Sequence, residues 1–485
     1  MSAIDWLSDS VSSDPLAFPW NEPTTSDGAG TESISVTPLD EVSPDAVGLL
    51  PTSVTGLPRT LWGTSSSEDL ARELEQIQTG LMPAMQDLLL TLLLAELDPP
   101  SDSDPSHALF LARVDALMEL GAVEQAEALL RRAGPSDEET FSRWFDASLL
   151  TGTEDAACAT LKIKPDLAPN LATRIFCLAR NGDWHAAAVT LETGRALDQL
   201  TGAEDAILAR FLDPETFSGA PELAPPTRPT PLVFRLYESV GEPIPSNILP
   251  LPFAQADLRL NTGWKSQIEA AERLARSGTL DENRLLGLYT ERQPAASGGV
   301  WDRVAAVQAF ETALAAGNHE EIASTLVHAW NVLGEADLQP VFADLYADKL
   351  ADAALGGEAG HLAFEVGLLS PHYESIALEH QPQDASEKFL KAVARGDVTG
   401  ISAPDETSAA IAEGFRMSTP PERLAGLVND GNLGEAILRA IRMATDGAQG
   451  DLEKLRDAVA LFRSIGLEDT ARRFALQTMI LVEDA

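Results

Sequence analysis

The sequence is poor in basic residues, in aromatic residues and in cysteine. Among its 485 residues, 75 are Asp or Glu and 34 are Lys or Arg, and only seven of these are lysines. The formal net charge of −41 repels nucleic-acid phosphates and anionic lipid headgroups, so the sequence argues against both as partners. The same charge suits a solubilising acidic surface, or a site for a basic partner or divalent cations.

Long apolar runs and catalytic signatures are also missing. The longest apolar stretch, residues 88–95, is too short to span a bilayer, so we expect no direct membrane insertion. The sequence has no His-Glu-x-x-His, no Gly-rich phosphate loop, no Gly-x-Ser-x-Gly and no Cys-x-x-Cys. The nearest histidine pair, His372 and His380, lacks the spacing of metal ligands on one face. We therefore expect no catalytic residues, no metal and no cofactor.

What the chain does contain is a pattern that occurs five times: an apolar helix end, a glycine turn and a second amphipathic helix. The glycines are Gly121, Gly182, Gly317, Gly431 and Gly466. Four of them have an alanine five positions later: Ala126, Ala187, Ala436 and Ala471. Glycine supplies the left-handed residue that ends a helix, and a small residue lets two helices pack closely. The pattern predicts an all-α protein built as a solenoid of antiparallel αα-hairpins.

Composition divides the chain into four expected parts. These are a disordered acidic tail over 1–65, a helical repeat lobe over 66–213, a proline-rich connector over 214–256 and a second helical lobe over 257–485. A single continuous superhelix is the alternative. In the first lobe, apolar spacing predicts helices over 67–79, 81–97, 106–120, 122–133, 137–150, 153–161, 169–181 and 183–196. In the last of these helices, Ala187, Val189 and Leu191 are expected on the core side.

The tail carries three tryptophans in a stretch rich in proline, serine and threonine. They are Trp6, Trp20 and Trp62. Aromatic residues in such a stretch dock either on a partner or on the folded part of the same protein, and the sequence leaves both readings open.

Cys158 and Cys177 fall in neighbouring expected helices that are separated by one turn. Two cysteines that close one short loop predict a structural disulfide, with Cα atoms roughly 4.4–6.8 Å apart. Two buried reduced thiols are the alternative. A structural disulfide indicates an oxidising compartment. The first residues lack the basic start and the apolar stretch of a signal peptide. The expected disulfide and the acidic, lysine-free N-terminus favour a signal peptide that has been removed, and the sequence leaves open whether Met1 is native or stands in its place.

The hairpins are similar to tetratricopeptide (TPR-like) repeats, because Gly431 and Gly466 are 35 positions apart and that family repeats about every 34 residues. The segments 2–10 and 176–184 resemble a group of exported helical proteins of alphaproteobacteria. The first resemblance implies a helical surface for partners, and the second implies a periplasmic location.

Taken together, these features predict a non-catalytic scaffold or adaptor. It would bind a protein or peptide partner on the concave face of the array, in the periplasm, as part of a cell-envelope assembly. Two alternatives stay open: a peptidoglycan-related envelope enzyme with its active site in 215–256, and a cytoplasmic TPR-like adaptor. The sequence leaves the oligomeric state open.

Overall fold

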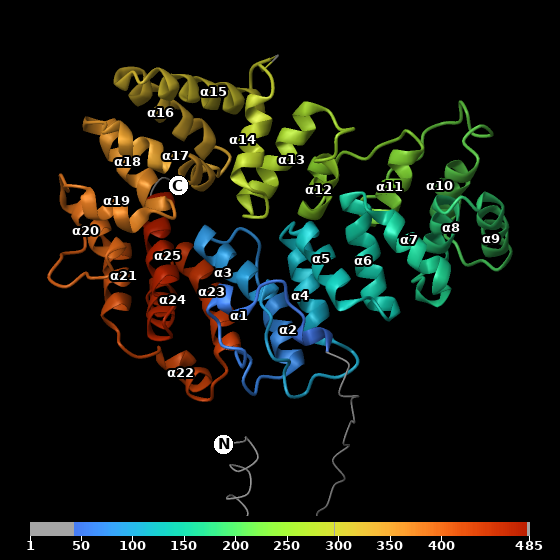
Figure 1. Ribbon diagram of the computed structural model, residues 1–485, viewed down its shortest axis with the longest axis horizontal. Helices are drawn as coiled ribbons and strands as arrows, with labels where there is room; N and C mark the ends of the chain where they lie inside the picture. The colour runs from blue at the N-terminus through green and yellow to red at the C-terminus, as the bar shows by residue number, and fades with distance from the viewer. Residues whose placement is uncertain (1–42, 295, 483–485) are drawn as a thin grey trace, which may run out of the picture. The chain divides into compact units, whose positions relative to one another are not determined.

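The computed structural model describes residues 43–294 and 296–482 (Figure 1). Within these ranges every regular element is an α-helix or a short 3-10 helix, and a single isolated β-bridge joins Leu50 to Ala95. The predicted all-α class is therefore confirmed. Over the same residues, no helix combines the length and the apolar character that a bilayer crossing requires.

The helices up to residue 196 follow the expected order. They are η1 (Pro44–Ala46), α1 (Thr52–Thr55), α2 (Ser67–Glu75), α3 (Pro83–Leu94), α4 (Ala108–Glu119), α5 (Val123–Ala133), α6 (Glu138–Thr151), α7 (Glu154–Ile163), η2 (Pro165–Leu167), α8 (Leu171–Arg180) and α9 (Trp184–Ala196). Polar side chains fix several starts: the Asp137 carboxylate accepts the Thr140 N–H at 2.9 Å, and the Asn170 side chain accepts the Thr173 N–H at 2.8 Å. The helices α2 to α9 lie where the apolar spacing predicts them.

The five glycine turns have the backbone conformation that the pattern requires. Their φ angles are 82° at Gly121, 85° at Gly182, 67° at Gly317, 80° at Gly431 and 87° at Gly466. At four of the turns, the residue after the glycine donates its N–H back across the turn, as Ala122 does to the Leu117 carbonyl at 2.8 Å. The four alanines that follow these turns, at 126, 187, 436 and 471, are fully buried. The small side chain is thus required by close helix packing.

The first described residues differ from the disordered tail expected over 1–65. Trp62 is only 1% exposed and packs on α23, where a Cβ at Gly434 would overlap its ring. Asp45 is fully buried, and its carboxylate accepts the Phe110 N–H at 2.8 Å in the first turn of α4. The prediction was wrong for 43–65 because these residues bury their few apolar side chains against distant helices. Trp6 and Trp20 lie outside the described residues.

The expected connector holds more helix than its prolines suggest. The helix before the connector is α10 (Gly202–Leu212). The helices within it or at its end are α11 (Pro231–Ser239), η3 (Ser246–Ile248), η4 (Leu251–Phe253) and α12 (Ala254–Asp257). The sequence predicts one helix within the connector, over about 231–240, and α11 lies there, whereas α10 was not predicted. The four prolines of residues 243–252 predict an extended run, but the structure has two 3-10 turns there. Their carbonyls are satisfied by Arg273, whose guanidinium donates to the carbonyls of Ser246 and Leu249 at 2.9 and 2.8 Å.

The remaining helices complete the described chain. They are α13 (Trp264–Arg276), α14 (Glu282–Thr290), α15 (Val300–Ala316), α16 (His319–Gly334), α17 (Gln339–Ala353), α18 (Gly357–Leu369), α19 (Tyr373–Glu379), α20 (Ala385–Ala394), α21 (Glu406–Arg416), α22 (Glu422–Asn429), α23 (Leu433–Ala448), α24 (Leu452–Ser464) and α25 (Glu468–Leu481).

The first and last helices pack against each other. Helices α2 and α3 contact α23, and α3 also contacts α25. The Thr64 N–H donates to Asn432 Oδ1 at 2.7 Å, and the Ala84 N–H donates to the buried Gln477 Oε1 at 2.8 Å. The chain from Ser43 onward is therefore one compact unit. The lobe boundaries near 213 and 257 stay a prediction.

Candidate protein-binding face on helix α9

Helix α9 is covered on one side only. Its main contacts are with α8 and α10, and its buried positions are Ala187, Leu191 and Gly194. The α8 side is close, because a Cβ at Gly194 would overlap the Leu171 side chain. Among the described helices, no other has extensive contacts with α9.

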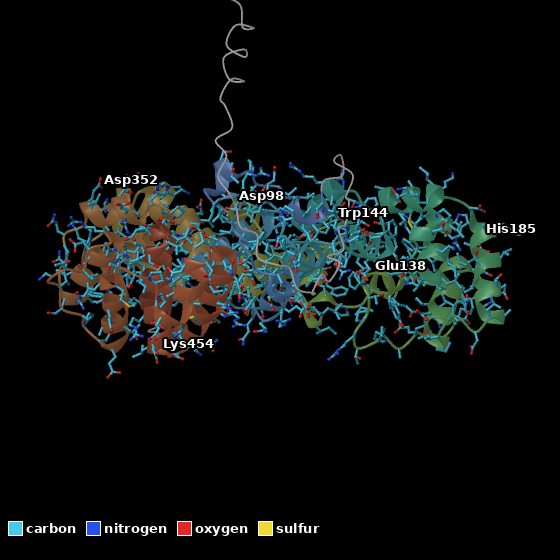
Figure 2. All side chains as sticks on the ribbon, turned by 90° about the horizontal axis from the view of Figure 1, so that it is seen from below. Asp98, Glu138, Trp144, His185, Asp352 and Lys454 are labelled. Carbon is cyan, nitrogen blue, oxygen red and sulfur yellow. A yellow bond between two sulfur atoms is a disulfide. The ribbon has the colours of Figure 1, made fainter. Side chains whose placement is uncertain are left out.

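The opposite side of α9 is exposed and largely apolar. Trp184 is 50% exposed, but its ring packs against Phe211 of α10 on the covered side, with the ring centroids 5.9 Å apart. On the uncovered side, Val189 is 52% exposed and Leu197, at the C-terminal end of the helix, is 60% exposed. Between them lies a shallow hollow whose lining comes entirely from this helix: His185, Ala188, Val189, Glu192, Thr193, Ala196 and Leu197. Figure 2 shows His185 pointing away from the neighbouring helices. We call this surface the α9 face.

The α9 face differs from the other exposed apolar positions. The described chain has five more large apolar side chains with high exposure: Val54, Ile163, Ile248, Leu260 and Leu378. These are spread over separate elements, and scattered exposed apolar residues are normal on protein surfaces. By contrast, α9 has two on one side of one helix, Val189 and Leu197, and Ala188 and Ala196 line the same hollow. This group is the candidate binding face.

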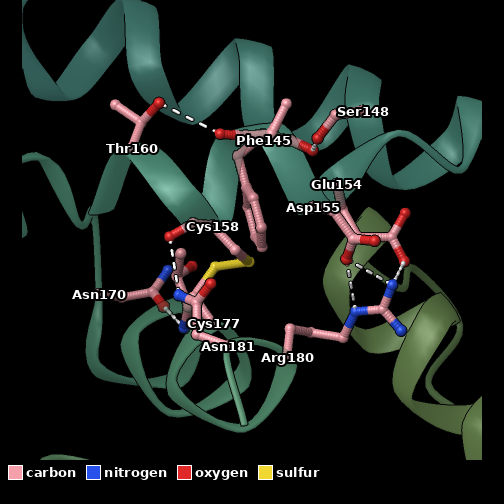
Figure 3. The surroundings of a disulfide bond; sticks show 12 residues. Phe145, Ser148, Glu154, Asp155, Cys158, Thr160, Asn170, Cys177, Arg180 and Asn181 are labelled. Atoms are coloured by element: carbon pink, nitrogen blue, oxygen red, sulfur yellow. Dashed lines mark hydrogen bonds and ion pairs between the residues drawn. A yellow bond between two sulfur atoms is a disulfide. The ribbon is translucent and has the colours of Figure 1, made fainter. Parts of the chain in front are cut away.

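A disulfide holds the two helices that precede α9. Cys158 of α7 and Cys177 of α8 are bonded, with their Cα atoms 4.8 Å apart, which is within the range the sequence predicts (Figure 3). Both side chains are buried. Next to the bond, the Asn181 side chain donates to the Cys158 carbonyl at 2.9 Å. The turn at Gly182 then leads directly into α9, so the covalent link holds the helix that precedes α9 and packs against it.

Ion pairs add to this support. The Arg180 guanidinium lies 2.6 Å from Asp155 and 3.5 Å from Glu154 (Figure 3). Glu154 is almost fully buried and also accepts a hydrogen bond from Arg235 of α11 at 2.9 Å. A carboxylate shared by two guanidinium groups is compensated within the low-dielectric interior. Helices α7, α8 and α11 are thereby held as one platform.

The residues singled out in the sequence have separate positions in the fold. Cys158, Cys177 and Gly182 come together in the platform that packs against α9 through α8. Gly121, Gly317, Gly431 and Gly466 end other helices and shape their own hairpins. Trp62 was considered a partner-docking aromatic, and this is wrong, because its ring is buried within the protein itself.

A second polar cluster joins α18, the end of α19 and α20. The buried Glu387 carboxylate accepts hydrogen bonds from His361 Nδ1 at 2.7 Å, from His380 Nε2 at 2.8 Å and from the Gln383 N–H at 2.6 Å. Ligand atoms of His361, Asp384 and Glu387 lie within 4.8 Å of one another, as in a cation site. Both Glu387 oxygens, however, already accept hydrogen bonds from nitrogen. We therefore interpret these residues as a hydrogen-bonded cluster, the Glu387 cluster, and the expectation of no metal stays a prediction.

The Glu387 cluster sets the ionisation of its members. Burial opposes the charge on Glu387, but the hydrogen bonds from two imidazoles and one backbone N–H outweigh burial and lower its pKa to about 2. Burial also disfavours the His361 imidazolium. The hydrogen bond to Glu387 and the charges of Glu365, Glu387 and Asp384 outweigh this effect and raise the His361 pKa.

These shifts predict how the cluster stabilises the fold at different pH values. The Glu387 contribution is complete above its ordinary pKa of 4.5 and is lost as the pH falls towards 2. The His361 contribution is complete below its ordinary pKa of 6.5 and is lost as the pH rises through its higher pKa in the folded protein. Denaturant titrations should therefore show that Glu387→Gln lowers the free energy of unfolding most between these two values. We expect a loss of about 1–3 kcal/mol there and a smaller loss on either side.

The matched control for this prediction is Glu358→Gln, which neutralises an exposed carboxylate on α18, the helix that carries His361. Its effect on the free energy of unfolding should stay within about 0.5 kcal/mol at every pH. A constant difference between the Glu387→Gln variant and the wild type, from pH 3 to pH 9, would contradict the linkage argument.

The expected connector contributes to a cavity of about 480 Å³. Its wall includes residues 243–247 together with Asp257, Arg259 and Arg273. Burial raises the pKa of Asp257, and this effect outweighs the hydrogen bond from the Ser246 hydroxyl and the nearby positive charges. One carboxyl group with a raised pKa has the property of a general acid, but the wall presents no second group in a defined catalytic geometry.

Comparison of the chain with protein-family models, with curated proteins and with solved structures found no match.

Sequence reasoning missed the α9 face, although a signal for it was present. Val189 was expected in the core together with Ala187 and Leu191, but the structure buries only the latter two. Apolar residues occur all around this helix, which is typical of a helix that is covered on all sides. The Glu387 cluster had no comparable signal, because its members meet only through the packing of α18, α19 and α20.

Proposed function

We propose that this protein is a non-catalytic scaffold or adaptor that binds a protein partner through the α9 face. The observation that carries the proposal is the group of exposed apolar side chains on α9, which lies on a platform fixed by a disulfide and by shared ion pairs. The glycine-turn hairpins support a TPR-like solenoid as the type of scaffold. In this proposal the partner binds α9, in place of the concave surface that the repeat pattern suggested.

The occupant that fits this face best is an amphipathic helix with basic residues beside its apolar stripe. Helix α9 already packs against helices on its covered side, and the small residues Ala188 and Ala196 leave a shallow groove for another. Carboxylates of Asp183, Glu192 and Asp198 lie along or at the ends of the helix. The net charge of −41 also favours a basic partner over an acidic one.

The periplasm is the compartment we propose. A buried structural disulfide persists in an oxidising space and is rare in the cytosol. An acidic surface with few lysines does not distinguish an exported protein from a cytoplasmic one. The proposal of a periplasmic location therefore rests on the disulfide.

The binding proposal predicts the effect of a single charge on the α9 face. Val189→Asp should weaken partner binding at least tenfold, because a carboxylate would be desolvated at the centre of an apolar contact. The measurement is affinity capture from periplasm and native membranes, followed by titration of the recovered partner against wild type and variant. The control is Val54→Asp, which changes another exposed valine, on α1, and should leave the affinity unchanged.

Two results would contradict the proposal. One is a partner that binds wild type and Val189→Asp with equal affinity. The other is a Val54→Asp variant that loses affinity to the same extent as Val189→Asp.

A peptidoglycan-related enzyme is the second candidate, and the cavity beside Asp257 is the observation that favours it. Purified protein would then release soluble fragments from cell-wall material, and Asp257→Asn would abolish that release. Under the scaffold proposal, neither protein releases fragments.

A further inference from the structure

A smaller cavity of about 210 Å³ lies where four helices meet. Its wall is formed by α6, α8, α10, α11 and the turn that precedes α8. The wall is mixed, and its apolar part includes Phe145, Ala172, Ile207, Leu232 and Leu236. Two carboxylates line it, Asp146 and Glu204, whereas no basic residue does.

Asp146 is the unusual member of this wall. No hydrogen bond and no ion pair joins its carboxylate to another described residue. The nearby Arg143 is directed elsewhere, because its guanidinium donates two hydrogen bonds to Asp115 of α4 at 2.7 and 2.8 Å. Burial consequently raises the pKa of Asp146 to about 7, and the charge of Arg143 only partly opposes this effect.

Glu272, a buried carboxylate of α13, is compensated by its neighbours. It accepts hydrogen bonds from the Tyr289 hydroxyl at 2.7 Å and from the Arg303 guanidinium at 2.8 and 2.5 Å. Asp146 is partly exposed and has no such partner, so its carboxylate stays available to a ligand in the cavity.

We infer that this cavity binds a cationic head group, either an ammonium or a guanidinium, on a short apolar stem. The carboxylate of Asp146 would pair with the cation, and Glu204 would add a second negative charge. The apolar side chains from α10 and α11 would cover the stem. The volume corresponds to about seven water molecules of liquid, which is room for such a head group and a few methylene groups.

A cationic head group on an apolar stem has two sources, and binding of either one agrees with the inference. One is a free alkylamine or alkylguanidine, and the other is the Lys or Arg side chain of a protein partner. The inference does not depend on the α9 face, because the cavity and that surface share no lining residue.

The probes are n-butylguanidinium and n-butylammonium, titrated into the full-length protein by calorimetry at pH 8, where Asp146 is ionised. Neutral n-butanol and anionic butyrate serve as ligand controls. We expect saturable binding of at least one cation, with an affinity at least tenfold above that of n-butanol, and no binding of butyrate. Asp146→Asn should weaken cation binding at least tenfold, whereas Asp166→Asn, which changes an exposed carboxylate, should leave it unchanged.

A second readout separates ion pairing from non-specific effects. At pH 6.5 part of the Asp146 population carries a proton, so binding of a cation should release protons, which titrations in buffers of different ionisation enthalpy detect. The Asp146→Asn variant should show no such release. Absence of saturable cation binding to wild type, or equal affinity in the Asp146→Asn variant, would overturn the inference.

A short peptide with one central arginine identifies the source. If it binds at least tenfold more tightly than n-butylguanidinium, and does so only with Asp146 intact, the cavity receives a side chain of a partner. If it binds more weakly, the site takes a free small cation.

Discussion

Replacing Trp62 with alanine is expected to lower the free energy of unfolding by about 3–5 kcal/mol. The Trp62 ring is 1% exposed and lies against α23 at Gly434. Its removal would leave a cavity between the first described residues and the C-terminal helices. Denaturant titration followed by far-UV circular dichroism measures the change. The Gly434 N–H donates to the Leu61 carbonyl at 2.9 Å, so loosening this contact should also expose the segment before α2 to proteolysis.

Two variants serve as controls for Trp62→Ala. The Trp62 indole N–H has no hydrogen-bond partner, so Trp62→Phe keeps most of the packing, removes an unsatisfied donor and should cost less than about 1.5 kcal/mol. Trp184→Ala removes a half-exposed ring that contacts Phe211 of α10, and it should cost less than about 1.5 kcal/mol in stability. A Trp62→Ala variant as stable as the wild type would show that residues 43–65 lie outside the core.

The sequence predicted well those features that depend on neighbours along the chain. Gly121, Gly182, Gly317, Gly431 and Gly466 adopt positive φ because a helix end needs a left-handed residue there. The buried alanines after four of these turns follow from the same local geometry. The pair Cys158 and Cys177 was identified for a similar reason, since one turn brings their two helices together.

Features that depend on distant contacts could not be predicted. Residues 43–65 have the composition of a disordered tail, and only α4 and α23 give Asp45 and Trp62 buried partners. Val189 is exposed because the described chain places no helix over that side of α9. Asp146 is an ordinary acidic residue of an amphipathic helix until α10 and α11 enclose it. In each case, the exposure of the residue depends on which distant helices pack together, and that packing cannot be predicted from a single sequence.

Removing the disulfide is expected to lower the free energy of unfolding by about 3 kcal/mol. The bond links residues that are 19 positions apart, and opening a loop of this size returns that amount of conformational entropy to the unfolded chain. The comparison is between oxidised protein and the same protein reduced with dithiothreitol, each titrated with denaturant. The double variant Cys158→Ala, Cys177→Ala should match the reduced protein, apart from a small cavity cost. Equal stability of the oxidised and reduced proteins would contradict the entropic argument.

The same bond tests the proposed compartment and the α9 face together. Protein isolated from cells without reductant and then denatured should show no reactive thiols, and after reduction it should show two. Because Cys177 lies in α8, which packs against α9, the reduced protein should also bind the partner more weakly, through faster dissociation from a less rigid platform. Two reactive thiols before reduction would remove the argument for the periplasm. If Val189→Asp still weakened partner binding in that case, the α9 face would remain the proposed binding surface, in a cytoplasmic adaptor.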